Sequence, residues 1–204
     1  MSEAYVSQTV RTSVQLMAWF AKANGRGIGK TKLMKLVYIS ERHRVRNSGL
    51  SITDDKLSAM PQGPVLSGAL NLLNPAKRTK VLDAYFSKYL DVVPIGRAFS
   101  IRAKAVDEDE FSENDLVSIR WTWANFGHCS MEQIVSITHK FPEWESKSDV
   151  EKTGSSIPIK YEEMLEDAEN DACKKFGKLD PERKRELIEE LSEHRKIKSA
   201  LAAR

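Results

Sequence analysis

Apolar positions near the start of the chain repeat with the period of an α-helix. Four of them share one helix face: Val10, Val14, Met17 and Ala21. This pattern predicts a helix over Val10–Asn24, ended by Asn24-Gly25-Arg26-Gly27. A second helix is predicted from Gly29-Lys30-Thr31 to Asn47-Ser48-Gly49, with apolar residues such as Leu33 on one face. Basic residues share another face of this helix: Lys32, Lys35, Arg42 and Arg46.

Proline and glycine interrupt the middle of the chain. Met60-Pro61-Gln62-Gly63-Pro64-Val65 forbids a continuing helix, and we expect a helix to restart at Pro64 and run through Leu72. Before it, Asp54 or Asp55 is expected to cap a brief turn through Ala59. Further helices are expected over Thr79–Leu90 and after capping boxes that open at Ser112 and Ser130.

A different period marks one segment between these helices. Phe99–Lys104 alternates strictly between apolar and polar residues, which is typical of a half-buried strand. Val92–Ile95 is its expected neighbour, with Gly96-Arg97 as the turn. The sequence therefore predicts a small antiparallel β-hairpin.

The last third of the chain is more polar. Ser146–Ile159 is expected to be a loop and Tyr161–Phe176 a helix, and Asp180-Pro181 opens a last, highly charged helix. The fold class predicted is α+β and predominantly helical. We expect a compact domain over residues 1–146, followed by a loop and a charged helical extension over residues 147–204.

Composition adds an uneven charge to this picture. Residues 1–50 hold nine Lys or Arg against two acids, whereas the rest holds 23 bases and 27 acids, so the two parts carry +7 and −4. The basic part could face nucleic acid or an acidic protein, and the acidic remainder makes nucleic acid the weaker of these interpretations. The two cysteines, Cys129 and Cys173, form no disulfide or zinc pattern, and no leader or membrane span is visible, so we expect a cytoplasmic protein.

Two segments suggest chemistry, and neither satisfies its spacing. Ser136-Ile137-Thr138-His139-Lys140-Phe141-Pro142-Glu143-Trp144 offers a histidine, but no activated nucleophile and no second metal ligand stand at a suitable spacing. We interpret it as a helix end in which Pro142 stops the helix and Trp144 folds back as an apolar plug. Gly25–Thr31 ends in Gly-Lys-Thr, yet Asn24 stands where a phosphate-binding loop needs its first glycine. We therefore expect no catalytic, metal or cofactor residues.

Partner binding has two candidate regions. The first is the basic second helix, where Lys35, Arg42 and Arg46 form either a solvated face or a contact with an acidic protein. Arg44 lies near the apolar face, which a buried partner carboxylate or a protein interface would explain. The second region is the last helix, which is either a fraying tail or a partner-binding helix with these candidate contacts: Arg183, Leu187, Leu191 and Arg195.

Three motifs occur together and in order. They are Lys32-Leu33-x-Lys35-Leu36-x-Tyr38, then Gly63-Pro64-Val65, then Phe126-Gly127-x-x-Ser130 followed by Thr138-His139 and Trp144. Together they resemble the Panacea domain of SocA-like antitoxins, also met in phage-associated GepA-like proteins, over roughly residues 8–146. The resemblance implies that these motif residues have a structural role in the domain.

The resemblance implies a non-enzymatic, cofactor-free antitoxin of a toxin–antitoxin module, with a link to phage defence. Its partner would be a cognate toxin protein that it neutralises by direct binding. One alternative is an adaptor that delivers the toxin to a ClpXP-type protease, as in the SocA branch, and another is a nucleic-acid-binding regulator. No membrane contact is expected, and homo-oligomerisation stays open.

Overall fold

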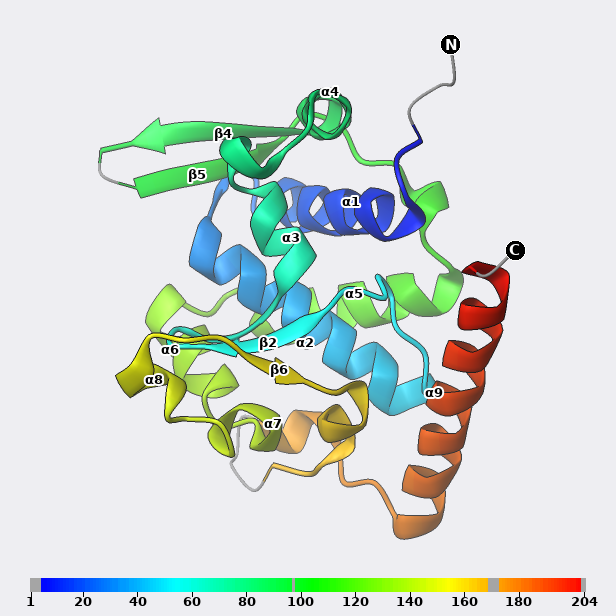
Figure 1. The fold of residues 1–204 in the computed structure, drawn as a ribbon. Helices are drawn as coiled ribbons and strands as arrows, with labels where there is room; N and C mark the ends of the chain where they lie inside the picture. Colours follow the sequence, from blue (N-terminus) through cyan, green and yellow to red (C-terminus); the bar gives the residue numbers. More distant parts are fainter. Residues whose placement is uncertain (1–4, 97, 169–172, 203–204) are drawn as a thin grey trace.

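Helix α2 (Lys30–Ser48) runs through the middle of the molecule in the computed structural model (Figure 1). The structure describes residues 5–96, 98–168 and 173–202. Helix α2 begins after Gly29 and ends at Gly49, whose φ of +63° is the left-handed conformation that stops a helix. Side chains all around α2 are buried, because other helices and strands pack on every side of it.

Three helices of the predicted set pack directly on α2. They are α1 (Gln8–Ala23), α5 (Glu113–Phe126) and α6 (Met131–Thr138). Both predicted capping boxes are confirmed, since the hydroxyls of Ser112 and Ser130 each accept a backbone N–H bond of 3.2 Å from the third residue of their helix. The helix expected after Thr79 is also present, as α4 (Lys80–Tyr89).

The predicted hairpin is confirmed and belongs to a three-stranded sheet. Strand β4 (Leu90–Ile95) pairs antiparallel with β5 (Ala98–Ala103), and β5 pairs on its other edge with β1 (Ile28–Gly29). Arg97 of the predicted turn lies outside the described residues. The outer part of the hairpin projects from the body of the molecule beside α1 (Figure 1).

A second three-stranded sheet was not predicted. Strand β2 (Leu57–Met60) pairs with β3 (Gly63–Leu66) on one edge and with β6 (Ile157–Ile159) on the other. The helix expected from Pro64 is therefore wrong at its start, because Pro64 pairs with Ala59 in this sheet and α3 (Ser67–Leu72) begins later. The turn expected through Ala59 is wrong for the same reason. Asp55 does act as a cap, since its carboxylate accepts the backbone N–H groups of Gly68 and Ala69 at 2.9 and 2.7 Å.

The segment after residue 140 departs furthest from the prediction. The expected loop contains α8 (Val150–Thr153) and β6, and it follows the short α7 (Pro142–Glu145). The helix expected over Tyr161–Phe176 is wrong. In its place lie two short 3-10 helices, η3 (Tyr161–Leu165) and η4 (Cys173–Phe176), while residues 169–172 lie outside the described part. The reason is that the carbonyl of Glu166 accepts bonds from Arg42 and Arg46 at 2.7 and 3.0 Å, so it is not used in a continuing helix.

Helix α9 (Pro181–Ala202) is confirmed and packs against the C-terminal half of α2. Side chains on both sides of residue 146 contribute to one hydrophobic core, those beyond it being Val150, Ile159, Met164, Leu165, Leu187 and Leu191. The boundary at 146 stays a prediction about folding units. In the described part of the chain, no helix has the length and hydropathy to cross a membrane. The remaining elements in the described part of the chain are two short 3-10 helices, η1 (Pro75–Lys77) and η2 (Glu108–Glu110).

Candidate functional site

The motif residues of the three separated segments meet around the N-terminal half of α2. The ammonium of Lys35 donates to the carbonyl oxygen of Pro64 at 2.8 Å, and that of Lys32 donates to the carbonyl of Gly127 at 2.7 Å. Both lysines thus hold loop backbone in place. Leu36 and Val65 are buried in the core beside them, so the first two motifs pack on each other.

Gly63 lets this junction close. Its φ of +95° favours glycine, and a Cβ added to it would lie 2.8 Å from the Lys35 ammonium and 2.9 Å from His139 Cδ2. Any side chain at this position would push the β2–β3 turn away from α2 and α6. Burial lowers the pKa of Lys35 to about 7, so its charge is only weakly held at neutral pH.

His139 and Trp144 form the lock that the sequence suggested. His139 ends α6, and its imidazole stacks on the Trp144 indole with ring centroids 3.8 Å apart. The buried indole donates its N–H to the carbonyl of Met60 at 2.9 Å, which ties α7 to the β2–β3 turn. Burial, followed by the charge of Lys35, lowers the pKa of His139, so the imidazole is neutral at pH 7. Its Nδ1 lies 3.4 Å from a carboxylate oxygen of Glu151.

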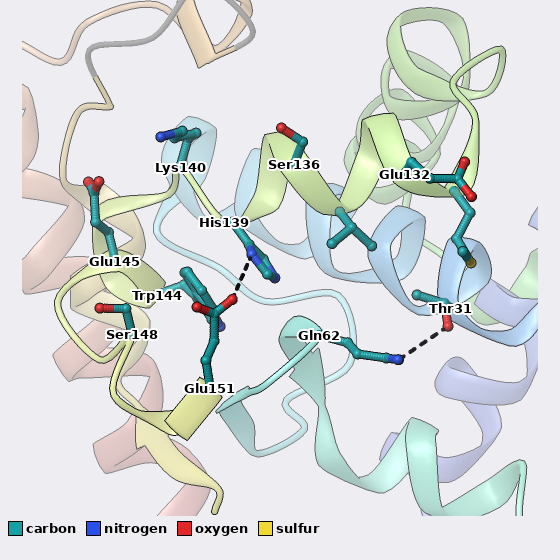
Figure 2. Close-up of a pocket in the computed structure, with 12 residues that line it drawn as sticks. Thr31, Gln62, Glu132, Ser136, His139, Lys140, Trp144, Glu145, Ser148 and Glu151 are labelled. Atoms are coloured by element: carbon teal, nitrogen blue, oxygen red, sulfur yellow. Dashed lines mark hydrogen bonds and ion pairs between the residues drawn. The ribbon is translucent and has the colours of Figure 1, made fainter. Parts of the chain in front are cut away.

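An open cleft of about 670 Å³ lies over this lock (Figure 2). Figure 2 shows the His139 and Trp144 rings inside it, with Thr31 of α2 and Gln62 of the β2–β3 turn facing each other across one end. Helix α6 contributes the apolar side chains of Met131 and Val135. The remaining lining is polar: Glu132, Ser136, Lys140, Glu145, Ser148 and Glu151. The cleft therefore has an apolar floor and more acidic than basic side chains around it.

The basic residues predicted as a solvated face on α2 are placed differently. Lys35, Arg42 and Arg46 are buried, so the expectation of a solvated face is wrong for them. Arg44 is also buried, and its guanidinium pairs with the half-buried carboxylate of Asp115 at 2.6 Å. Other elements cover this side of the helix and supply carboxylates and carbonyl groups, which a helical wheel of α2 alone does not reveal. Direct partner contact by these four residues stays a prediction, and it would require them to become exposed.

The most enclosed of these pairs joins α2 to α7. Arg42 Nε donates to Glu143 Oε1 at 2.8 Å, and the hydroxyl of Tyr38 donates to the same oxygen at 3.1 Å. The guanidinium also lies over the rings of Phe141 and Phe176, 4.6 and 4.8 Å from their centroids. The motif tyrosine and the segment before Trp144 are thus joined by one buried polar network.

The candidate residues of α9 divide into two groups. Leu187 and Leu191 are buried against α2 and η3, so they hold α9 to the chain itself. Arg183 donates to the carbonyl of Asn47 at 3.0 Å, and Arg195 pairs with Glu162 at 2.5 Å. The two arginines keep exposed surface, whereas the two leucines do not.

Glu41 is a buried acid that the sequence analysis missed. Its carboxylate accepts hydrogen bonds from the hydroxyls of Ser51 and Tyr161, the latter at 3.1 Å. Burial raises the pKa of Glu41 to about 7. Its position four residues after Val37 on the apolar face was the available signal. Within the described ranges, no three His, Cys, Asp or Glu side chains gather in a way that could hold a metal ion.

A comparison with protein-family models matches residues 33–145 to the family described as "Antitoxin SocA-like, Panacea domain". The matched segment contains all three motifs except Lys32, and it includes the lock of His139 and Trp144. Searches of curated proteins and of solved structures found no match.

Proposed function

The chain belongs to the family of SocA-like antitoxins with a Panacea domain, and on that premise we propose that it neutralises a cognate protein toxin by direct, non-catalytic binding. The family supports an antitoxin role in general. The proposal adds that neutralisation occurs by sequestration and that the cleft over His139 and Trp144 receives part of the toxin.

The observation that carries the proposal is the coincidence of the family segment with the cleft. Residues 33–145 supply the β2–β3 turn, all of α6 and the Trp144 floor, and the motif residues lie directly beneath them. A domain whose motifs build one open, partly apolar cleft is suited to receive a segment of another protein.

The geometry around His139 supports binding rather than catalysis. Its imidazole is stacked on Trp144 and faces Glu151, and neither Ser136 nor Ser148 forms a hydrogen bond to it in the described part of the chain. A histidine that activates a nucleophile needs that nucleophile within hydrogen-bonding reach. The cleft therefore offers contact surface rather than an arranged reaction centre.

Charge and hydropathy indicate what kind of segment would fit. The floor is apolar, with Met131, Val135 and Trp144, while Glu132, Glu145 and Glu151 stand around it. An amphipathic toxin segment with apolar side chains and Lys or Arg at its margins would complement both properties. Helix α9 can add contacts through its exposed side chains, for example Arg183, Arg195 and Ile197.

The test uses growth rescue and binding with the protein encoded by the neighbouring gene as the toxin. Met131→Asp places a charge in the cleft at a side chain that is 48% exposed, and Val117→Asp is the matched control on α5 at 57% exposure. We expect Met131→Asp to weaken rescue and binding and Val117→Asp to leave both unchanged. Rescue at wild-type level by both variants would remove the cleft from the proposal, whereas no rescue by the wild type would remove this toxin pairing altogether.

Toxin lifetime separates sequestration from delivery to a ClpXP-type protease. Sequestration predicts an inactive but persistent toxin in cells, while an adaptor predicts that toxin decays faster when the chain is present. Nucleic-acid regulation has less support, because four of the nine basic residues in the first 50 are buried inside the fold. Light scattering of the purified chain, alone and with toxin, would measure stoichiometry and homo-oligomerisation.

A further inference from the structure

The outer half of the β4–β5 hairpin exposes apolar side chains. Ile95 and Phe99 are each 55% exposed, although both stand in regular paired strands. The strand register places them on opposite faces. Ile95 lies across from Ala98, on the face that also carries Val93 and Arg102, whereas Phe99 continues the row of Ile101, which packs in the core.

Cations gather at the base of this hairpin, and one of them, Arg102, shares the face of Ile95. Lys22, Arg26 and Arg102 line a hollow of about 540 Å³. Gly27 holds the turn with Arg26 against β5, because a Cβ on it would lie 2.4 Å from Ser100 Oγ and 2.9 Å from Arg102 Cγ. The turn that carries Arg26 is therefore packed closely against the strand that carries Arg102.

These cations have no carboxylate partner in the part of the chain that the structure describes. Asp91 lies across from Arg102 in the strand register and is the acid on this face, yet it forms no ion pair with Arg102 among the described residues. This contrasts with the buried Arg42, Arg44 and Arg46, each of which has a carboxylate partner: Glu143, Asp115 and Asp167. The exposed cations are thus left for an external anion.

The hairpin and the cleft lie on neighbouring parts of the surface. Arg26 lies in the short connection between α1 and α2, and Thr31, in the first turn of α2, lines the cleft. Figure 1 shows β4 and β5 at the upper left of the molecule and α6 and α8 below them on the left. A protein bound in the cleft can continue onto this face of the hairpin.

We propose that the surface formed by Lys22, Arg26, Val93, Ile95 and Arg102, the arm surface, binds an acidic and partly apolar patch of the toxin. The inference rests on the proposed function, because it names a second contact of the same partner. Charge complementarity favours acidic residues opposite the three cations, and Ile95 and Val93 favour apolar neighbours within the same patch.

A protein patch fits better than a nucleic acid. Single strands are bound by aromatic rings that stack on bases beside cations that hold phosphates. Here the exposed aromatic ring, Phe99, is on the opposite face of the hairpin from Arg102. The apolar side chains on the face of Arg102 are Val93 and Ile95, which offer apolar contact without stacking.

The test compares two pairs of variants for binding to the neighbouring-gene protein. Arg26→Glu/Arg102→Glu reverses two arm-surface charges, and Lys56→Glu/Lys178→Glu makes the same change of net charge on other elements. Ile95→Asp and Phe99→Asp change equally exposed residues on the two faces of the hairpin. We expect the Kd to rise roughly 100-fold for the arginine pair at low salt, with a smaller rise at high salt because screening shortens the reach of charge. Ile95→Asp should weaken binding, and both controls should bind like the wild type.

Each outcome decides the inference. If Arg26→Glu/Arg102→Glu and Ile95→Asp both bind the toxin with the Kd of the wild type, the arm surface is overturned and the antitoxin proposal still stands. If Phe99→Asp or Lys56→Glu/Lys178→Glu loses as much affinity for the toxin as the arm-surface variants do, the assignment to this face is overturned. Absence of wild-type binding would overturn both proposals. If the wild type shifts the mobility of a DNA duplex, Arg26→Glu/Arg102→Glu does not, and toxin binding is the same for both, the cations bind nucleic acid instead.

Discussion

Replacing Glu143 by alanine should be among the most damaging single changes in this protein. The Glu143 carboxylate accepts hydrogen bonds from Arg42 and Tyr38, and the side chains of Arg42 and Glu143 are 1% and 0% exposed. Glu143→Ala leaves the guanidinium buried without its counter-ion. Breaking such a pair by removing one partner costs about 3–5 kcal/mol.

The structure places this variant at the lower end of that range. Arg42 would keep its bond to the Glu166 carbonyl and its position over the rings of Phe141 and Phe176. One oxygen of Glu143, Oε2, is buried and accepts no hydrogen bond from any described residue, so part of the desolvation cost is already present in the wild type. We therefore expect a loss of about 3 kcal/mol, which for a chain of this size lowers the Tm by roughly 6–12 °C.

Thermal and urea unfolding of the purified variants would measure this loss. Tyr38→Phe/Arg42→Met/Glu143→Leu replaces the network with apolar groups and should recover most of the stability. The surface control Glu186→Ala, which removes an exposed partner of Arg183, should change stability by less than about 0.5 kcal/mol. A loss below about 1 kcal/mol for Glu143→Ala would refute the reasoning, because it would mean that water reaches the guanidinium.

Three further changes test other parts of the fold by the same unfolding measurements. Trp144→Ala removes a buried indole and its hydrogen bond, and should cost about 3–5 kcal/mol; an unchanged Tm would assign the ring to the surface. Gly63→Ala should cost more than Gly25→Ala, because both glycines have positive φ but only at Gly63 would a Cβ meet the Lys35 ammonium; equal losses would contradict the close approach. The pKa of Glu41 is raised from 4.5 to about 7 in the folded protein. The stability that its protonated carboxyl contributes is therefore complete below pH 4.5 and is lost as the pH rises toward about 7. Relative to Glu41→Gln, the wild type should lose on the order of 3 kcal/mol across that window, and parallel pH profiles would show that Glu41 titrates normally.

The helical part of the fold was largely predictable from local pattern. Capping boxes at Ser112 and Ser130, and the glycine after α2, act within one helical turn, so the chain carries that information locally. The β4–β5 hairpin was predictable for a similar reason, since strict alternation and a short turn suffice. The second sheet was not, because Pro64 suits a first helical turn as well as a strand. Its strand pairing depends on contacts with Ile157–Ile159, far along the chain.

The candidate site shows the same division between local and distant information. The helix end at His139 and the burial of Trp144 follow from Pro142 and the helical period, whereas the stacking of the two rings was not predicted. The buried placement of Arg42 and Arg46 does not follow from the local sequence pattern. A helical wheel shows which side of α2 is least apolar, but the covering elements that carry Glu143 and Asp167 come from distant segments. Burial on that side is a property of the whole fold.

This internal pairing changes what the charge asymmetry of the chain means. The excess of +7 in the first 50 residues suggested an external anionic partner, but Arg42, Arg44 and Arg46 are neutralised by carboxylates from the acidic remainder. A buried pair of this kind contributes little to the field that a partner meets at the surface. In the proposal made above, recognition depends on charges that stay outside, among them the cations of the arm surface and the acids around the cleft. Because these two groups are of opposite sign and lie on adjacent surfaces, a partner that matches both must present its own charges in one orientation, and that requirement gives specificity that net charge alone cannot.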